Sequence, residues 1–385
     1  MITDENRDLH NSPLEVGGEK GGRIIIAGGG TGGHIFPAIA IANALKKIKP
    51  DIEILFVGAK GKMEMEKVPQ AGYRIEGIDI AGFNRSSLIK NIGLPFKLIK
   101  SFFLVRRIVN SFNPDAVVGV GGYSSFPVLR FVQAKGIPNF IHESNSFAGR
   151  SNILLGKKAT RIFVASDGME KFFPAEKIMI TGNPVRETIV KNRITKEKGT
   201  EFFGLDANKK IVFVTGGSLG AKTINEAIDA GVTEFKKADL QVIWQTGKLY
   251  AAKAAEKAAE DKNIWANDFI SQMEYAFGAA DIVVSRSGAM SIAELCVVGK
   301  PVVFVPYPYA AEDHQTVNAQ TLVNKNAGIL VKDSEAKDKL VKTVIALSTD
   351  IQKQKELSEN ISRLAVKNAD TRIAEEIIKL MTGNR

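Results

Sequence analysis

Three glycine-rich turns are the part of this sequence best suited to chemistry on phosphate groups. They span residues 28–33, 119–122 and 216–220, and each directly follows a short apolar run typical of a buried strand. Glycine lets the backbone approach a ligand closely, and a helix N-terminus directs unpaired N–H groups toward an anion. One such turn is most often only a tight connection, but three of them favour a site that handles diphosphate groups.

Two familiar nucleotide motifs are matched only in part by these turns. The first turn contains G-x-G-x-x-G, but a dinucleotide enzyme also places an acidic residue at the end of the next strand, and residues 56–60 read FVGAK. The third turn resembles a P-loop, but Ala221 stands where a glycine must precede Lys222. The sequence therefore argues against NAD binding and against ATP hydrolysis.

The densest group of small and polar residues is SRSGAMSIAE, residues 285–294. Ser287 and Gly288 are suited to open a helix whose first amides cradle a phosphate group. Glu294 lies about two turns further along that helix and can accept hydrogen bonds from vicinal ribose hydroxyls. An isolated glutamate is more often a solvated helix carboxylate, but this setting favours contact with a ligand.

Residues for sugar transfer can be assigned around this group. Gln315 and Asn318 are three apart, so they share one helical face and can bind sugar hydroxyls. Arg186 and the helix terminus at Ser287 can neutralise a departing diphosphate. Because no spacing of His, Cys, Asp and Glu suits a metal ion and no Asp-x-Asp is suited to a metal-diphosphate, we predict a reaction without metal or cofactor.

The acceptor hydroxyl needs a base, and histidine is the usual choice. Of the four histidines, His34, His142 and His314 lie at the edges of motifs, and only His10 lies in the N-terminal segment. A lone histidine is usually structural, but three at motif edges favour function. We predict His34 as the base or as the residue that orients the reacting groups, with Glu143 as the second candidate.

The elements that position these residues alternate between strand-like runs and helical periodicity, as in a parallel sheet with crossover helices. After residues 23–27 and the first turn, we predict a helix that begins at Pro37, with Ile41, Leu45 and Ile48 at helical spacing. The other predicted strands are 54–57, 116–120, 139–142, 161–165, 211–214, 241–245, 281–285 and 301–305.

The length of 385 residues and two successive strand–helix series predict two domains. Asn183-Pro184-Val185 and the polar stretch after it place a hinge near residues 184–186. We predict an α/β protein in which two Rossmann-like domains, 23–184 and 185–364, face each other across a cleft. Residues 1–22 are polar, lack the apolar stretch of a secretory signal, and are predicted to be a disordered tail.

The net charge of +10 suits nucleic acid, an anionic membrane or an acidic substrate. Residues 83–107 mix Lys and Arg with Phe and Leu, and no acidic residue lies between Asp79 and Asp115. This mixture suits a membrane surface, although a core helix with a solvated face explains it about equally well. We expect no nucleic-acid partner because no reader motif is present. The single cysteine, Cys296, fits a reducing cytoplasm, and no apolar run is long enough to span a membrane.

Six motifs occur in order along the chain: GGGTGGH (28–34), GVGGY (119–123), HESN (142–145), GNPVR (182–186), GGSLGA (216–221) and SRSGA (285–289). With these motifs the chain resembles the two-domain GT-B glycosyltransferases that complete the lipid intermediate of peptidoglycan, and the resemblance covers about residues 23–380. It implies inverting transfer of GlcNAc from UDP-GlcNAc to the 4-hydroxyl of undecaprenyl-diphosphate-linked MurNAc-pentapeptide. It also implies a peripheral enzyme on the cytoplasmic face of the bacterial plasma membrane, with a C-terminal helix, 365–385, that packs back on the first domain.

The resemblance further implies a donor site. Ile270 meets uracil through its backbone, Glu294 holds the ribose, and the acceptor diphosphate lies over the first domain's glycine turns, where Tyr123 is a further contact. Leu219 departs from the glutamine of some members, which puts a sugar contact there in doubt. The implied donor contacts are Thr31, Gly32, Gly33, Asn145, Arg186, Ser218, Ile270, Ala289, Met290, Ser291, Ile292, Ala293, Glu294 and Gln315.

Two other classes remain open. One is a different UDP-sugar protein of the same architecture, such as a glycolipid synthase or a UDP-GlcNAc 2-epimerase, although an epimerase has no need for a lipid-facing basic segment. The other is a non-catalytic module that binds a UDP-sugar or a lipid diphosphate, which would bind the donor without releasing UDP. Product analysis separates all three.

Overall fold

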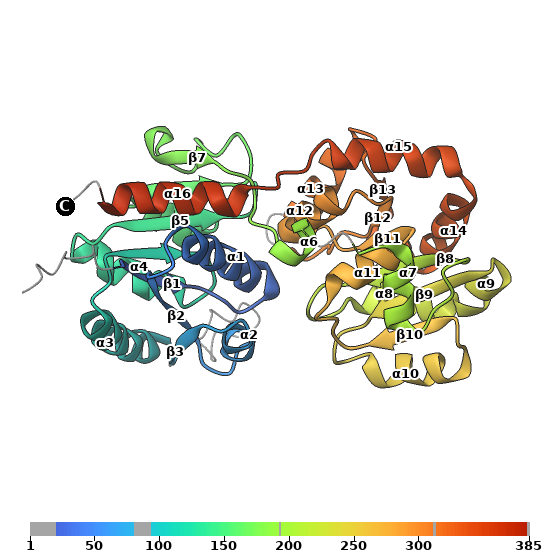
Figure 1. Ribbon diagram of the computed structural model, residues 1–385, viewed down its shortest axis with the longest axis horizontal. Helices are drawn as coiled ribbons and strands as arrows, with labels where there is room; N and C mark the ends of the chain where they lie inside the picture. Colours follow the sequence, from blue (N-terminus) through green and yellow to red (C-terminus); the bar gives the residue numbers. More distant parts are fainter. Residues whose placement is uncertain (1–20, 81–93, 192–193, 311–312, 383–385) are drawn as a thin grey trace, which may run out of the picture.

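The computed structural model describes residues 21–80, 94–191, 194–310 and 313–382. They form two α/β halves, each with a parallel sheet between helices (Figure 1). The predicted disordered tail lies outside the described residues except for residues 21 and 22, and so does the part of the basic segment before residue 94. The fold predicted from the sequence is confirmed: two Rossmann-like sheets in two domains.

The first sheet has the strand order β3-β2-β1-β4-β5-β6-β7, with all pairs parallel. After β1 the chain adds β2 and β3 on one side, and β4 to β7 follow on the other side. The switch point therefore lies between β1 and β4. The strands are β1 Arg23–Ala27, β2 Glu53–Ala59, β3 Arg74–Ile78, β4 Ala116–Gly119, β5 Asn139–Glu143, β6 Arg161–Val164 and β7 Ile178–Ile180. Its helices are α1 Gly32–Ile48, α2 Glu64–Gln70, α3 Leu94–Phe112, α4 Ser125–Ala134 and α5 Arg150–Gly156.

The second sheet repeats this plan with the order β10-β9-β8-β11-β12-β13, and its switch point lies between β8 and β11. The strands are β8 Lys210–Thr215, β9 Leu240–Gln245, β10 Ile264–Asn267, β11 Ile282–Ser285, β12 Val302–Phe304 and β13 Ile329–Leu330. The helices are α6 Glu187–Lys191, α7 Lys196–Phe203, α8 Lys222–Ala230, α9 Val232–Lys237, α10 Ala251–Glu260, α11 Met273–Ala279, α12 Ala289–Val298, α13 His314–Val323, α14 Ala336–Thr349 and α15 Ile351–Ser362.

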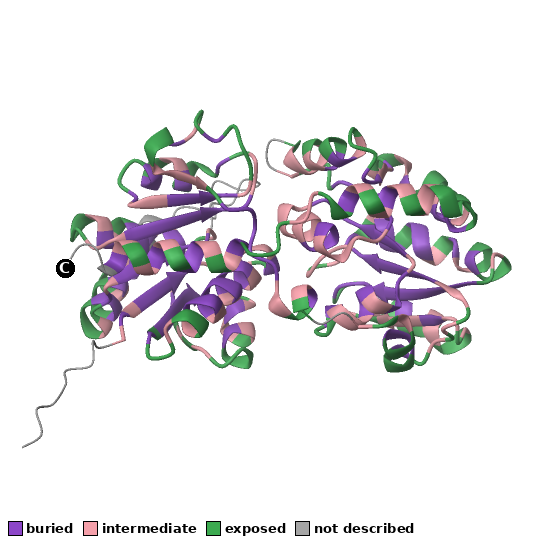
Figure 2. Ribbon diagram, turned by 45° about the horizontal axis from the view of Figure 1, so that its top comes forward, coloured by how far each residue is buried: buried purple, intermediate pink, exposed green. Residues whose placement is uncertain are grey.

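The central strands carry continuous apolar runs because helices cover both faces of each sheet, and Figure 2 shows these strands buried. In β1, Ile24 and Ile26 pack with α1, whereas Ile25 and Ala27 pack with α3 and α4 on the other face. The helix α16, Ala369–Thr382, returns from the second half and packs against α1 (Figure 1). Its apolar face, which includes Ile373 and Ile377, joins the core of the first half.

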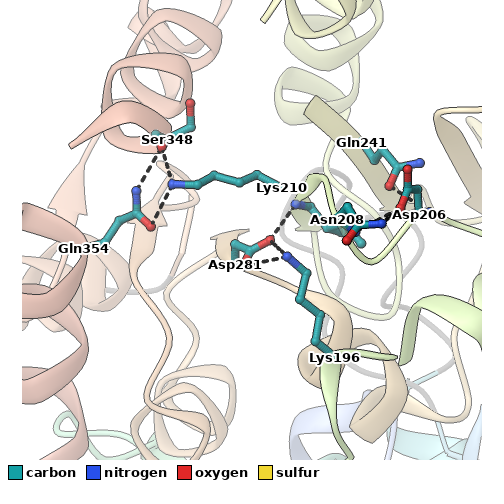
Figure 3. A network of polar contacts seen from close by, with 9 residues as sticks. Lys196, Asp206, Asn208, Lys210, Gln241, Asp281, Ser348 and Gln354 are labelled. Atoms are coloured by element: carbon teal, nitrogen blue, oxygen red, sulfur yellow. Dashed lines mark hydrogen bonds and ion pairs between the residues drawn. The ribbon is translucent and has the colours of Figure 1, made fainter. Parts of the chain in front are cut away.

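A polar network fixes the amino ends of the central strands of the second sheet (Figure 3). Asp281 accepts a hydrogen bond from the backbone N–H of Ile211 at 2.8 Å and pairs with Lys196 Nζ at 2.8 Å. Lys210 Nζ donates to the carbonyl of Ser348 at 2.5 Å, which ties β8 to the end of α14. These contacts hold helices to the edge opposite the carboxyl ends of the strands, where ligands bind in such sheets.

Two predicted helix boundaries are wrong. The C-terminal helix expected to begin at residue 365 begins at Ala369. The helix expected to begin at Pro37 begins at Gly32, with Thr31 as its N-cap residue, so Pro37 lies in its second turn. Because proline has no N–H, the carbonyl of Gly33 receives no hydrogen bond from it. The earlier start places the first amides of α1 directly at the glycine turn.

Candidate active site

The two switch points face one cavity of about 820 Å³ between the halves. The glycine turns that follow β1 and β8 contribute Gly33 and Gly217 to its lining, and the loop after β11 contributes Arg286. A crevice at the carboxyl ends of strands beside a switch point is the usual ligand site of open α/β sheets. The cavity therefore brings two such sites together.

A buried carboxylate holds the first glycine turn in place. Glu64, at the start of α2, is 1 % exposed and accepts hydrogen bonds from the backbone N–H of Gly30 at 2.7 Å and of Ala59 at 2.9 Å. The sequence pattern does not predict this role, because Glu64 binds backbone groups that only the folded sheet brings to it. Glu64 therefore sets the position of the loop that precedes α1.

The first two glycine turns pack directly against each other. A Cβ atom built on Gly122, whose φ is +83°, would lie 2.3 Å from the carbonyl oxygen of Gly29. The second turn therefore cannot accept a side chain at this contact. The preceding glycine, Gly121, lies against the imidazole of His34, so the second turn also fixes the predicted base.

His34 lies in the first turn of α1 and lines the cavity. Burial lowers the pKa of His34, and the nearby Glu143 and Glu64 act in the opposite direction. Its Nδ1 atom is fully covered and has no hydrogen-bond partner. A neutral imidazole at the cavity wall is suited to accept a proton.

Glu143, the second candidate base, is 4 % exposed and is not among the residues that line the cavity. One carboxylate oxygen accepts hydrogen bonds from the backbone and side chain of Asn145 at 3.1 and 3.2 Å. The other accepts from Gly149 N at 3.1 Å and from Asn152 Nδ2 at 2.8 Å. These four donors make Glu143 the anchor of the loop that carries Asn145 to the cavity.

The N-terminus of α12 points at the cavity from the second half. Gly288 is its N-cap residue, and Ala289, Met290 and Ser291 form the first turn along the cavity wall. The unpaired amides and the dipole of such a turn favour an anionic ligand. Ser287 lies beneath the turn, where its hydroxyl donates to the carbonyl of Gln315 at 2.8 Å.

Two predicted donor contacts bind each other. Arg186 donates to both carboxylate oxygens of Glu294, at 2.8 and 3.0 Å. The guanidinium also stacks on Phe36 of α1, 4.5 Å from the ring centroid. Arg186 therefore touches both halves of the molecule, and its charge is held at the cavity wall.

Gln245, at the end of β9, organises the far wall of the cavity. Its amide donates to Thr215 Oγ1 at 3.0 Å and to the carbonyl of Gly217 at 3.1 Å. Its oxygen accepts from the backbone N–H of Ile270 at 3.0 Å. The backbone N–H of Ile270 is therefore already paired with a protein group. No local signal in the sequence marks Gln245, because its partners lie on two other segments of the chain.

The structure brings most of the predicted site residues together. Those that do not line the cavity are the exposed Tyr123 and the supporting Glu143, Ser287, Ile292, Ala293 and Asn318. Asn318 links the halves instead, since it donates to the carbonyl of Ser287 at 3.2 Å and accepts from Ser146 Oγ at 3.1 Å. Those that line it are Thr31, Gly32, Gly33, His34, Asn145, Arg186, Ser218, Ile270, Gly288, Ala289, Met290, Ser291, Glu294 and Gln315.

The described residues contain no group of three or more His, Cys, Asp and Glu side chains arranged to hold a metal ion. Within the same residues, no helix has the length and apolar character needed to cross a membrane.

Known proteins match the chain over almost its whole length. Residues 24–164 match the glycosyltransferase family 28 N-terminal domain, and residues 211–376 match the family 28 C-terminal domain. A Parabacteroides distasonis protein named UDP-N-acetylglucosamine--N-acetylmuramyl-(pentapeptide) pyrophosphoryl-undecaprenol N-acetylglucosamine transferase is 52% identical, over 93% of this chain and 98% of its own. A Bacteroides fragilis protein of that name is 51% identical over 93% and 95%.

Solved structures agree with this assignment. The crystal structure of Acinetobacter baumannii MurG has a TM-score of 0.70 and 28% identity, and the match covers 93% of this chain and 99% of that one. A UDP-N-acetylglucosamine 2-epimerase has a TM-score of 0.67 over 95% and 97% of the two chains, but at 17% identity it shows only the shared fold. The chain belongs to glycosyltransferase family 28.

Proposed function

We propose that this chain transfers GlcNAc from UDP-GlcNAc to the 4-hydroxyl of undecaprenyl-diphosphate-linked MurNAc-pentapeptide, with inversion at the anomeric carbon. This reaction belongs to peptidoglycan biosynthesis and so serves cell-wall growth and division. The observation that carries the proposal is the sequence identity of 51–52%, along nearly the whole chain, with transferases named for this reaction. The switch points of the two sheets face the same cavity, so one sheet can bind the donor and the other the acceptor.

The second half binds the donor. The first turn of α12 and the guanidinium of Arg186 hold the diphosphate, Glu294 accepts from the ribose hydroxyls, and the carbonyl of Ile270 meets uracil. Gln315 faces the sugar. Because Arg186 and Glu294 pair with each other, the donor replaces part of that ion pair when it binds. Further contacts come from Thr31, Gly32, Gly33, Asn145 and Ser218, all at the cavity wall.

The first half binds the acceptor over its glycine turns and supplies the base. His34 takes the proton of the acceptor hydroxyl as that oxygen forms a bond to the anomeric carbon, and the bond from this carbon to the UDP oxygen breaks. The α12 dipole and Arg186 stabilise the negative charge that develops on the leaving diphosphate. These groups provide the stabilisation without a metal ion. Glu143 has the supporting role of holding the Asn145 loop.

The chain acts at the cytoplasmic face of the plasma membrane as a peripheral protein. In the described part of the basic segment, α3 buries Val105 and Ile108 and exposes Phe103, Arg106 and Arg107. Phe103 is 69 % exposed, and an aromatic side chain beside cations suits an anionic lipid surface. No nucleic acid takes part.

Two domains move relative to each other in this cycle. The first comprises residues 23–184 together with the C-terminal segment, 365–385, which contains α16, and the second comprises 185–364. Separate apolar cores on the two sheets support this division. Closure about residues 184–186 brings the donor to the acceptor. Scattering curves that are identical with and without UDP-GlcNAc would contradict closure.

Product analysis tests the function. Incubation with UDP-GlcNAc and the lipid-linked MurNAc-pentapeptide is expected to give a lipid heavier by one N-acetylhexosamine, joined by a β-linkage to O4. A UDP-sugar isomer formed without acceptor would indicate an epimerase instead. Tight UDP-GlcNAc binding without any product would indicate a binding module.

A further inference from the structure

A stacked pair of side chains joins the two halves at the wall of the cavity. The guanidinium of Arg186, in the second half, lies over the ring of Phe36, in α1 of the first half, at 4.5 Å from the ring centroid. A cation at this position is attracted by the negative face of the ring, and the attraction is stronger where water is excluded. The Arg186 side chain is only 16% exposed, so the stack is largely shielded from solvent.

The ring of Phe36 lies close against the start of α1. Gly32 precedes it by one helical turn, and a Cβ atom built on Gly32 would lie 3.0 Å from Phe36 Cε2 and 2.5 Å from Ser218 Oγ. Because glycine has no side chain, the ring can pack over the first turn of the helix. Phe36 and Arg186 also line a second cavity of about 540 Å³, so the stacked pair forms part of the wall that the two cavities share.

The other partner of the guanidinium is the predicted ribose contact. Arg186 Nε and Nη2 donate to the two carboxylate oxygens of Glu294, at 2.8 and 3.0 Å. In the proposed donor complex the ribose hydroxyls compete with Arg186 for these oxygens. Phe36 binds the guanidinium through the face of its ring, which accepts nothing from the ribose. The stack is therefore the contact of Arg186 for which the donor does not compete.

We propose that Phe36 is the residue that positions Arg186 for the donor diphosphate. The stack keeps the guanidinium at the cavity wall when the ribose takes up Glu294, and the N–H groups that Glu294 releases become available to phosphate oxygens. Because α1 carries both Phe36 and the predicted base His34, the stack also ties the cation that neutralises the leaving group to the helix that carries the base. This inference rests on the proposed function, in which Arg186 binds the diphosphate.

Binding of UDP and of uridine separates an effect on the diphosphate from an effect on the nucleoside. Phe36→Leu keeps an apolar side chain but removes the aromatic face. We expect the Kd for UDP to rise about 5- to 30-fold, the range for loss of a shielded cation–π contact, and the Kd for uridine to change less than about twofold. Phe36→Tyr keeps the ring face and is expected to bind UDP like the unmodified protein. Calorimetry measures the Kd for UDP, and an NMR titration measures the Kd for uridine.

A double-mutant cycle tests whether Phe36 acts through Arg186. In the Arg186→Gln background, Phe36→Leu is expected to leave the Kd for UDP unchanged, because no guanidinium remains for the ring to hold. Phe131→Leu is the matched control. Phe131 lies in α4, where the Nζ atom of Lys135 is 5.5 Å from its ring centroid, and it is not among the residues that line either cavity. Loss of this second cation–π contact is expected to leave the Kd for UDP unchanged.

Three results would overturn this role of Phe36. They are an unchanged Kd for UDP in Phe36→Leu, equal losses of affinity for UDP and uridine, and a loss in the Arg186→Gln background as large as in the otherwise unmodified protein. If Phe36→Leu does not fold, Phe36→Met removes the ring with a more adaptable side chain, and the same outcomes decide. The proposed function fails separately: an unmodified protein that binds no UDP would refute the donor site itself, whereas UDP binding that is indifferent to Phe36 would leave that site intact.

Discussion

Replacement of Glu64 by glutamine tests whether a buried carboxylate holds the first glycine turn. The carboxylate accepts from Gly30 N at 2.7 Å and from Ala59 N at 2.9 Å, one on each oxygen. Glutamine keeps one acceptor oxygen but turns an NH₂ group toward the other donor, which leaves a buried N–H unsatisfied. A hydrogen bond to a charged group contributes about 1.5–3 kcal/mol, and the unsatisfied donor costs a similar amount.

We therefore expect Glu64→Gln to lose about 2–4 kcal/mol of folding free energy, which corresponds to a fall in Tm of roughly 5–15 °C for a domain of this size. The displaced turn should also lower kcat/KM, because His34 follows it directly. Calorimetry and UDP-release kinetics measure the two effects. Glu66→Gln is the control: Glu66 lies on the same helix, and its side chain is 65% exposed. A Tm equal to that of the control would refute the role assigned to Glu64.

Four further outcomes follow from the same geometry. Glu294→Ala removes the ion pair with Arg186 and the ribose acceptor, so the KM for UDP-GlcNAc should rise about 10- to 100-fold; an unchanged KM in initial-rate assays would contradict the ribose contact. Because burial lowers the pKa of His34, the acid limb of kcat/KM against pH should lie below the ordinary imidazole value of about 6.5, and a limb above it would argue against His34. Burial lowers the pKa of His142 to about 4, so the unfolded chain binds a proton that the folded chain does not between pH 6.5 and 4. Stability should fall as pH drops through this window by roughly 3 kcal/mol at most, and chemical denaturation of His142→Gln should lack that contribution. Burial raises the pKa of the Cys296 thiol to about 12, so a thiol reagent at neutral pH should modify it only in denaturant; rapid modification of the native protein would show that it is accessible.

Strands with continuous apolar runs were predictable, and so were the turns that follow them, because parallel strands covered on both faces must be apolar throughout. The edge strands β3, β7, β10 and β13 were not predicted. The sequence of β3, RIEGI, alternates charged and apolar residues, and β7 and β13 have only three and two residues. The start of α1 was misplaced because Pro37 looks like a first-turn residue, whereas the glycines before it already adopt the helix.

The chemistry of the site was predictable where one short segment carries it, as in the helix that begins after Gly288. Contacts between distant segments were not. Arg186 and Glu294 are 108 residues apart, and nothing local in either segment shows that they pair. The same holds for Glu64 and Gln245, whose partners belong to other segments.

UDP release from UDP-GlcNAc, with and without the lipid-linked MurNAc-pentapeptide, in detergent and with EDTA present, tests the central claim most directly. The account predicts release that depends on the acceptor and persists in EDTA. Release that is absent with the acceptor, or that needs no acceptor, would contradict the transferase assignment, and release abolished by EDTA would contradict the metal-free stabilisation of the leaving group.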